Sequence, residues 1–279
     1  MFVFLNGQFV PEAEAVVSVS DRGFLYGDGL FETVRVFNGK PFRLAQHLER
    51  LVRGADYLRI KLPFTPRELD RFATQLIEKN ARPDAILRVT LTRGPGERGY
   101  TPKGANTPTL VMTLHTAAAL DPVNPPQWRL ATSTHRIPVS DALASFKTGN
   151  KLLQVVARLE AEANGADEAL ILNTNGEVAE AAGANVFWVD HEQICTVPAG
   201  RGGLPGITQA VILEICEVLG LPTSKRVIKP EALRHAEGIF LSQSALGVVC
   251  ITSFDGEPVP QSSLAGKIHQ AYCEMLAKE

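Results

Sequence analysis

The chain has 279 residues, of which 45% are hydrophobic and 21% charged, as expected of a globular protein with a sizeable core. Its net charge of −2 argues against a nucleic-acid or anionic-membrane partner. The four cysteines form no CxxC pair and the six histidines show no HxH or HExxH spacing. The sequence therefore predicts no metal site and no disulfide framework, and it favours a cytoplasmic protein. We expect no membrane span and no signal peptide, because apolar runs are short and the N-terminus lacks basic residues.

The first part of the chain predicts a sheet with two helices. Short strands are expected at residues 3–5, 8–10, 15–18 and 30–36. The hydrophobic period changes at Leu44, which predicts a helix, and Thr65 followed by Pro66 is typical of a second helix start. Two longer strands, at 86–92 and 109–115, complete this part.

A stretch with the composition of a linker separates two predicted domains. We expect a small N-terminal domain over 1–115, the linker over 116–126 and a larger domain over 127–279. In the larger domain we expect hairpins at 168–179 and 185–197 and helices at 150–163, 208–219 and 263–278. Because the strands come in hairpin groups and do not alternate with helices, the predicted class is α+β, not a doubly wound parallel sheet.

The loop after the strand at 86–92 contains Gly94, Gly96 and Gly99 in the spacing of a dinucleotide fingerprint. That fingerprint requires a helix at the third glycine, and the following Tyr100-Thr101-Pro102 cannot start one. A Rossmann site is therefore excluded. Arg93 and Arg98, with help from Tyr100, have the chemistry to grip a substrate carboxylate, although a solvated basic loop explains the same residues.

Three further features suit pyridoxal 5′-phosphate (PLP). Lys147 follows small and apolar residues, where desolvation favours a nucleophilic amine. Glu180 lies among alanines at a strand end, where a pyridinium N–H would satisfy its charge. Residues 204–208 precede a helix, whose N-terminus is suited to phosphate. Each has a plainer interpretation: a surface lysine, an exposed edge glutamate, and an ordinary turn with a helix cap.

Additional groups for the phosphate are present elsewhere in the sequence. Arg50, on the polar side of the first helix, offers a positive charge. Ser242 and Ser244 each offer a hydroxyl.

The chain resembles the class IV aminotransferases, the fold-type IV PLP enzymes, over nearly its whole length. The matching runs lie at residues 20–23, 26–33, 47–51, 146–150, 165–170, 180–187 and 204–208. The resemblance implies a two-domain subunit with a small α/β sandwich-like N-terminal domain and a larger pseudo-barrel domain. It also implies a homodimer whose active site lies near the domain boundary and is completed by the partner subunit.

The resemblance assigns roles to particular residues. Lys147 would form the Schiff base with PLP and shuttle protons, and Glu180 would pair with the pyridine nitrogen. The phosphate would be held by Arg50, the backbone N–H groups of Ile207 and Thr208, and the Ser244 hydroxyl. For the walls of the substrate pocket we name Phe31, Arg35, Arg98 and Tyr100.

The implied reaction is amino transfer from an amino acid or amine to a 2-oxo acid. The alternative is an aminodeoxychorismate lyase, which releases pyruvate and 4-aminobenzoate. Leu152 occupies the position at which branched-chain enzymes usually place a tyrosine, and Asn150 resembles the D-amino acid and lyase groups. Tyr100 and Trp188, with their neighbours, resemble the lyases, whereas residues 204–208 are closer to the transaminases. The subgroup stays open at this point.

Overall fold

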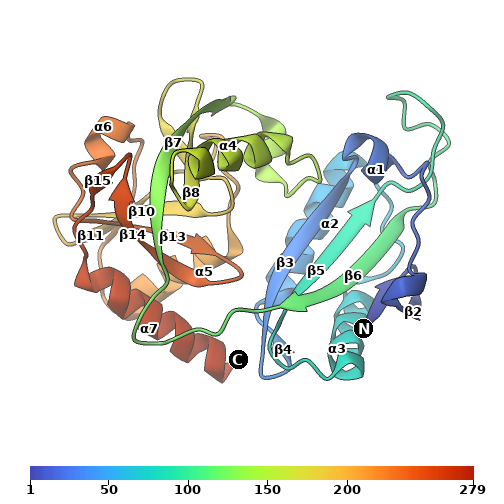
Figure 1. Ribbon diagram of the computed structural model, residues 1–279. Helices are drawn as coiled ribbons and strands as arrows, with labels where there is room; N and C mark the ends of the chain where they lie inside the picture. Colours follow the sequence, from blue (N-terminus) through green and yellow to red (C-terminus); the bar gives the residue numbers. More distant parts are fainter. The chain divides into compact units, whose positions relative to one another are not determined.

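The computed structural model describes all residues from 1 to 279, and its contacts divide the chain into two compact units (Figure 1). The first unit comprises Met1–Ala118, Phe146–Lys151 and Glu279. The second comprises Ala119–Ser145 and Leu152–Lys278. The helices and strands of each unit account for its core separately.

The first unit contains a six-stranded sheet in the order β2-β1-β6-β5-β3-β4, in which all neighbours are antiparallel. Its strands are β1 (Phe2–Leu5), β2 (Gln8–Pro11), β3 (Gly29–Phe37), β4 (Lys40–Pro41), β5 (Ala85–Thr92) and β6 (Thr109–Thr116). A 3₁₀ turn (Glu12–Glu14) follows β2, and residues 15–18 form no strand, contrary to the prediction. Val16 and Val17 have strand propensity but lie exposed with no neighbouring strand to pair with.

Three helices complete the first unit: α1 (Arg22–Tyr26), α2 (Leu44–Leu58) and α3 (Pro66–Asn80). Helix α2 packs on β3 and α3 packs on β1 and β6, which places the core between the helices and the sheet. Leu44, Leu48 and Leu51 are buried on one face of α2, as the hydrophobic period predicts. Thr65 and Glu68 form a capping box at the start of α3, which confirms the predicted start.

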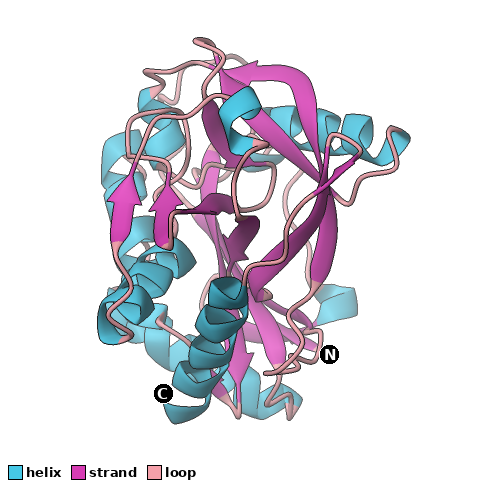
Figure 2. Ribbon diagram, turned by 90° about the vertical axis from the view of Figure 1, so that its left-hand side faces the viewer, coloured by secondary structure: helices cyan, strands magenta, loops and turns pink.

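The second unit contains a nine-stranded mixed sheet in the order β12-β11-β10-β13-β14-β7-β8-β9, with β15 paired to β14. Its strands are β7 (Gln127–Ile137), β8 (Glu168–Asn173), β9 (Val178–Ala181), β10 (Asn185–Asp190), β11 (Gln193–Thr196), β12 (Thr223–Lys225), β13 (Gly238–Gln243), β14 (Gly247–Phe254) and β15 (Glu257–Pro258). The register shifts between β7 and both of its neighbours, and Figure 2 shows long, bent strands. Such irregularities increase bending and twist.

The helices of the second unit are α4 (Leu152–Ala163), α5 (Ile207–Val218), α6 (Pro230–Leu233) and α7 (Ser263–Lys278), with a 3₁₀ turn at Ala142–Ser145. The predicted hairpins are confirmed, since β8 pairs with β9 and β10 with β11, both antiparallel. The α+β class is likewise confirmed: the first sheet is wholly antiparallel, and the second is curled and mixed. No helix has the length and apolar character needed to cross a membrane.

The segment Phe146–Lys151 groups with the first unit, although it lies inside the range 127–279 expected for the second domain. The reason is its backbone pairing with β3. The N–H of Phe31 donates to the carbonyl of Lys147 at 2.9 Å, and the N–H of Gly149 donates to the carbonyl of Gly29 at 2.8 Å. Phe146 also stacks on Tyr57, with ring centroids 4.5 Å apart.

Candidate active site

In the first unit, Lys147 is held at the edge of β3, with its ammonium against an aromatic ring. Its Nζ lies 4.7 Å from the ring centroid of Phe31, and the guanidinium of Arg88 lies 4.0 Å from the same centroid. An aromatic face attracts a cation but offers it no hydrogen bond acceptor comparable to water. Phe31, one of the four predicted pocket residues, is therefore in direct contact with Lys147.

Arg50, the predicted phosphate ligand of this unit, belongs to a buried polar cluster with Glu32 and His47. Glu32 accepts hydrogen bonds from Nε and Nη2 of Arg50 at 2.8 and 2.7 Å. The Nδ1 of His47 lies 2.7 Å from Oε2 of Glu32, the same oxygen that accepts from Nη2 of Arg50. Two of these residues come from one face of α2 and the third from the inward face of β3. Arg50 is therefore held in one orientation before it meets any ligand.

Charge and burial set the protonation of this cluster. Burial raises the pKa of Glu32, but hydrogen bonds from Arg50 and His47 outweigh it and hold that pKa below its usual range. Burial lowers the pKa of His47, and the nearby positive charges of Arg50 and Lys147 lower it further against the opposing effect of Glu32. At neutral pH His47 is consequently an uncharged imidazole that donates its Nδ1–H to an ionised Glu32.

The other three predicted pocket residues lie elsewhere in the first unit. Arg35 is buried, and its Nη1 donates to the carbonyl of Ala118 at 2.8 Å. Arg98 and Tyr100 lie exposed on the loop between β5 and β6. Within this unit, the structure brings Phe31 together with Lys147, while Arg35 holds the chain beyond β6.

In the second unit, Glu180 and the loop before α5 form one bonded assembly. Glu180 lies on β9 and is 8% exposed. Its Oε2 accepts the N–H of Leu204 at 2.8 Å. Asn185, at the start of β10, donates its Nδ2 to the carbonyl of Leu204 at 2.7 Å. The predicted partner of the pyridine nitrogen is therefore tied directly to the predicted phosphate loop.

Two glycines let this loop approach the sheet so closely. A Cβ at Gly203 would lie 2.8 Å from the carbonyl oxygen of Ala179. A Cβ at Gly206 would lie 2.0 Å from Oδ1 of Asn185, far inside van der Waals contact. Any side chain at either position would push the loop away from β9 and β10.

The N-terminus of α5 has the features of an anion site. Gly206 is its N-cap and supplies no side-chain cap, so the first-turn N–H groups of Ile207 and Thr208 lack an intrahelical or capping acceptor. The hydroxyls of Thr208 and Ser244 lie 3.5 Å apart. The Ser242 hydroxyl is buried and has no hydrogen bond partner among the protein's groups. Ser242 pairs with Asn185 across β13 and β10, so both side chains lie on the sheet face that meets Gly206.

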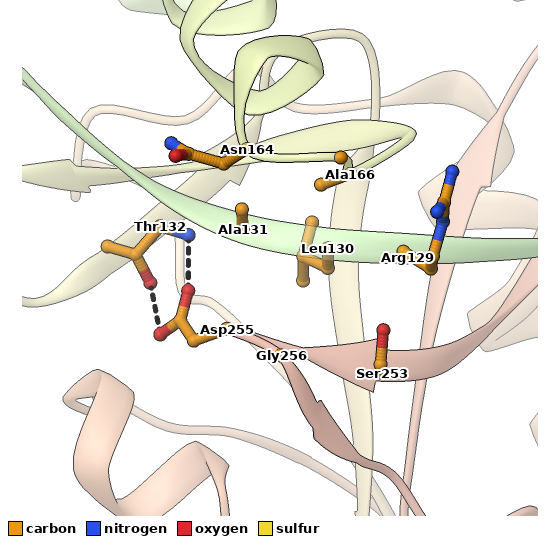
Figure 3. Close-up of a pocket in the computed structure, with 10 residues that line it drawn as sticks. Arg129, Leu130, Ala131, Thr132, Asn164, Ala166, Ser253, Asp255 and Gly256 are labelled. Atoms are coloured by element: carbon orange, nitrogen blue, oxygen red, sulfur yellow. Dashed lines mark hydrogen bonds between the residues drawn. The ribbon is translucent and has the colours of Figure 1, made fainter.

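A hollow of about 480 Å³ elsewhere in the second unit includes neither an uncapped helix start nor the unpartnered Ser242 hydroxyl (Figure 3). It lies beside β7 and the end of β14, and Arg129 and Asp255 are its two charged residues. Asp255 accepts hydrogen bonds from the backbone and hydroxyl of Thr132, at 2.6 and 3.0 Å, and from Arg234. Its carboxylate thus serves to join strands, and none of the predicted site residues lines this hollow.

Comparison with known proteins identifies the family of this chain. A family model described as amino-transferase class IV matches residues 29–254. A provisionally named branched-chain-amino-acid aminotransferase of Methanocaldococcus jannaschii is 32% identical, over 93% of this chain and 90% of its own. A D-alanine aminotransferase of Staphylococcus aureus is 31% identical, over 92% and 90%. The branched-chain aminotransferase structure from Thermoproteus uzoniensis has a TM-score of 0.93 at 29% identity and covers 100% of this chain and 96% of its own.

The fold and the family match together define a fold-type IV enzyme, and the chain belongs to the class IV aminotransferase family. It is accordingly a PLP-dependent aminotransferase.

The residues present fit PLP on structural grounds. The unpartnered Ser242 hydroxyl and the uncapped start of α5 suit a phosphate. The buried Glu180 carboxylate suits a protonated ring nitrogen, and the Lys147 amine suits an aldehyde. Sequence analysis did not identify Glu32, His47 or Asn185. The sequence did contain an indication for Glu32. It alternates with Leu30 and Val34 on the buried face of β3, and a carboxylate buried there requires a partner.

Proposed function

We propose that this enzyme moves an amino group between an amino acid and a 2-oxo acid, with PLP bound by Lys147, Glu180 and the start of α5. The observation that carries the proposal is the 2.8 Å hydrogen bond between Leu204 N–H and Glu180. It couples a buried carboxylate to a loop that leads into an uncapped helix N-terminus, and a phosphorylated pyridine has a group that suits each of them.

Each residue has a distinct task in this proposal. Bound PLP supplies an electron sink for the carbanion formed at the substrate α-carbon. Lys147 would supply the amine that holds the cofactor, and, once the substrate amine has displaced it, that amine would carry a proton to and from the α-carbon as a general base and acid. Glu180 holds the proton on the ring nitrogen. Arg50, the N–H groups of Ile207 and Thr208, and the Ser244 hydroxyl hold the phosphate, and Ser242 is placed to assist.

The relatives bear on the substrate without deciding it, since one is named for branched-chain amino acids and another for D-alanine. Leu152, in place of the expected tyrosine, lies 69% exposed at the start of α4. We propose Phe31, Arg35, Arg98 and Tyr100 as substrate-side residues, and a homodimer as the working form. Four buried, unbridged cysteines favour the reducing cytoplasm as its location.

Two measurements test this proposal. The protein with bound PLP should be yellow; its reduction with borohydride should trap the cofactor on Lys147, and peptide mapping identifies the residue. Lys147→Ala should lose the colour and the activity, whereas Lys151→Ala, four residues along the same segment, should keep both. A label on any other lysine contradicts the assignment.

The second measurement is a panel of D-alanine, L-leucine and aminodeoxychorismate, the amino acids being supplied with a 2-oxo acid acceptor. We expect amino transfer from at least one amino acid. Release of pyruvate and 4-aminobenzoate from aminodeoxychorismate alone would instead establish the lyase.

A further inference from the structure

A single buried arginine holds the loop between β5 and β6 by its backbone. Arg22, at the first position of α1, is 3% exposed. Its Nη1 donates to the carbonyls of Gly99 and Thr101 at 2.9 and 3.1 Å, and its Nη2 donates to the carbonyl of Tyr100 at 3.1 Å. Figure 1 shows this loop beside α1. One guanidinium thus fixes three consecutive peptide units.

The arginine is itself anchored by Asp28. The Nε of Arg22 donates to Asp28 at 2.8 Å, and Arg93 donates to the same carboxylate at 2.7 and 2.9 Å. Burial raises the pKa of Asp28, but the hydrogen bonds from Arg93 and Arg22 outweigh this effect and hold the pKa below its usual range. The carboxyl is therefore ionised at neutral pH. Arg93 directs its remaining donors to the carbonyls of Leu58 and Arg59 and not to the loop.

Tyr26 adds a second point of attachment. Its hydroxyl accepts the N–H of Gly99 at 2.9 Å, and its ring meets Tyr100 edge-on at 5.6 Å. Gly99 has φ +111°, a conformation that favours glycine, and a Cβ at Gly96 would lie 3.0 Å from Cδ of Arg22. Gly96 of the apparent dinucleotide fingerprint therefore allows the loop to pack against Arg22, and Gly99 supplies the backbone conformation of the loop.

The loop backbone is fixed, but its side chains are not buried. Tyr100 is 88% exposed and Arg98 is also exposed, although the carbonyls of the three residues that follow Arg98 are bonded to Arg22. A loop rich in glycine would otherwise sample many conformations. Holding its backbone lowers the entropy lost when Arg98 and Tyr100 engage a ligand.

We propose that Arg22 is a positioning residue for the substrate. It fixes residues 99–101 so that Arg98 and Tyr100 present a preformed grip for the carboxylate of the amino acid or 2-oxo acid. This inference rests on the proposed function, because it requires a carboxylate substrate. Tyr26 contacts the loop at Gly99, and Phe31, five residues later, pairs with the backbone of Lys147. The same short segment of chain therefore positions the loop and Lys147.

The test compares Arg22→Gln with Arg93→Gln in the holoenzyme. Both variants remove an arginine from Asp28, but only the first releases the loop. Trypsin cuts after Arg98 and Lys103, so the rate of cleavage at these two bonds reports loop mobility. We expect that rate to rise about tenfold or more in Arg22→Gln and less than about twofold in Arg93→Gln.

Steady-state kinetics distinguish a positioning role from a purely structural one, because a purely structural role would leave the KM of the folded enzyme unchanged. In Arg22→Gln we expect the KM for the amino acid to rise about tenfold while kcat stays within about twofold. Arg22→Lys keeps the charge for Asp28 but cannot reach three carbonyls, so it should behave like Arg22→Gln. An unchanged KM, or an equal rise in Arg93→Gln, overturns the proposal even if the loop becomes mobile.

If Arg22→Gln fails to fold, Tyr26→Phe replaces it, since that change removes only the acceptor for the Gly99 N–H. It should raise the trypsin rate and the KM in the same direction by a smaller factor, and no change in either overturns the proposal. Failure of the proposed function is recognised separately. In that case the wild-type enzyme itself transfers no amino group from any amino acid.

Discussion

Glu32 holds Arg50 by two parallel hydrogen bonds of 2.8 and 2.7 Å, in a place where neither residue is more than 4% exposed. A buried guanidinium is costly unless it is paired, and this pairing is bidentate. The charge of Arg50, the predicted phosphate ligand, is therefore already balanced by Glu32, which also fixes the orientation of its guanidinium. Its partner carboxylate came from β3, 18 residues away in the chain.

Replacing Glu32 with glutamine should destabilise the protein by about 3 kcal/mol, because the charge of Arg50 would remain buried without its counterion. Urea unfolding of the cofactor-free protein measures this loss. Glu49→Gln, an exposed change on the same helix, is the control and should cost less than about 0.5 kcal/mol. Equal losses in the two variants would contradict the importance of the pair.

His47 should make the stability depend on pH. The folded protein keeps its imidazole neutral, with a pKa below the ordinary 6.5, so unfolding takes up a proton. The contribution is present above pH 6.5 and is lost as the pH falls from there through the folded pKa, with a slope of up to about 1.4 kcal/mol per pH unit. His47→Asn keeps a donor for Glu32 and should flatten that slope in unfolding experiments.

The exposed His235 provides the control for this pH experiment. His235→Asn should leave the slope between pH 5 and pH 7 as it is in the wild type. A slope that is steep in His47→Asn would show that other groups cause the acid instability.

The loop before α5 should not tolerate a methyl group at Gly206. Gly206→Ala places a Cβ on the side chain of Asn185, so we expect weaker cofactor binding and a loss of stability of about 1–3 kcal/mol. In Gly266→Ala, inside α7, the new Cβ meets no atom within 4 Å, and the change should stabilise by about 0.5–1 kcal/mol. Thermal unfolding of both variants checks the opposite signs.

Asn185→Ala in the Gly206→Ala background sharpens that comparison. It removes the atom against which the new methyl group collides. The double variant should therefore lose less stability than the sum of the single changes. Strict additivity would mean that the clash is not the cause.

Ser242→Ala should separate stability from phosphate binding. The hydroxyl is buried without a protein partner, so its removal should leave the cofactor-free protein as stable as before or more stable, by about 1 kcal/mol. Inorganic phosphate should raise the melting temperature of the wild type more than that of Ser242→Ala. Ser262→Ala, on the loop before α7, is the control and should respond to phosphate like the wild type. An equal phosphate shift in Ser242→Ala would remove Ser242 from the anion site.

Much of the local structure was accessible from the sequence. The starts of α2 and α3 and the β8–β9 and β10–β11 hairpins were predicted because periodicity, capping and turn residues act over a few positions. The strand expected at 15–18 failed because strand propensity has no effect without a neighbour to pair with. The sequence also predicts candidate groups for PLP, because an amine, a carboxylate and a helix start have characteristic contexts.

Only the tertiary structure decided how those groups are held. Arg22 meets carbonyls up to 79 residues away, and Glu180 meets an N–H 24 residues away. Such contacts depend on strand register and on how helices lie across a sheet, and short sequence patterns encode neither. The sequence by itself thus determined which chemistry the chain carries. The packing of β3 against α2, and of the loop after β5 against α1, determined which side chains are fixed and which are exposed.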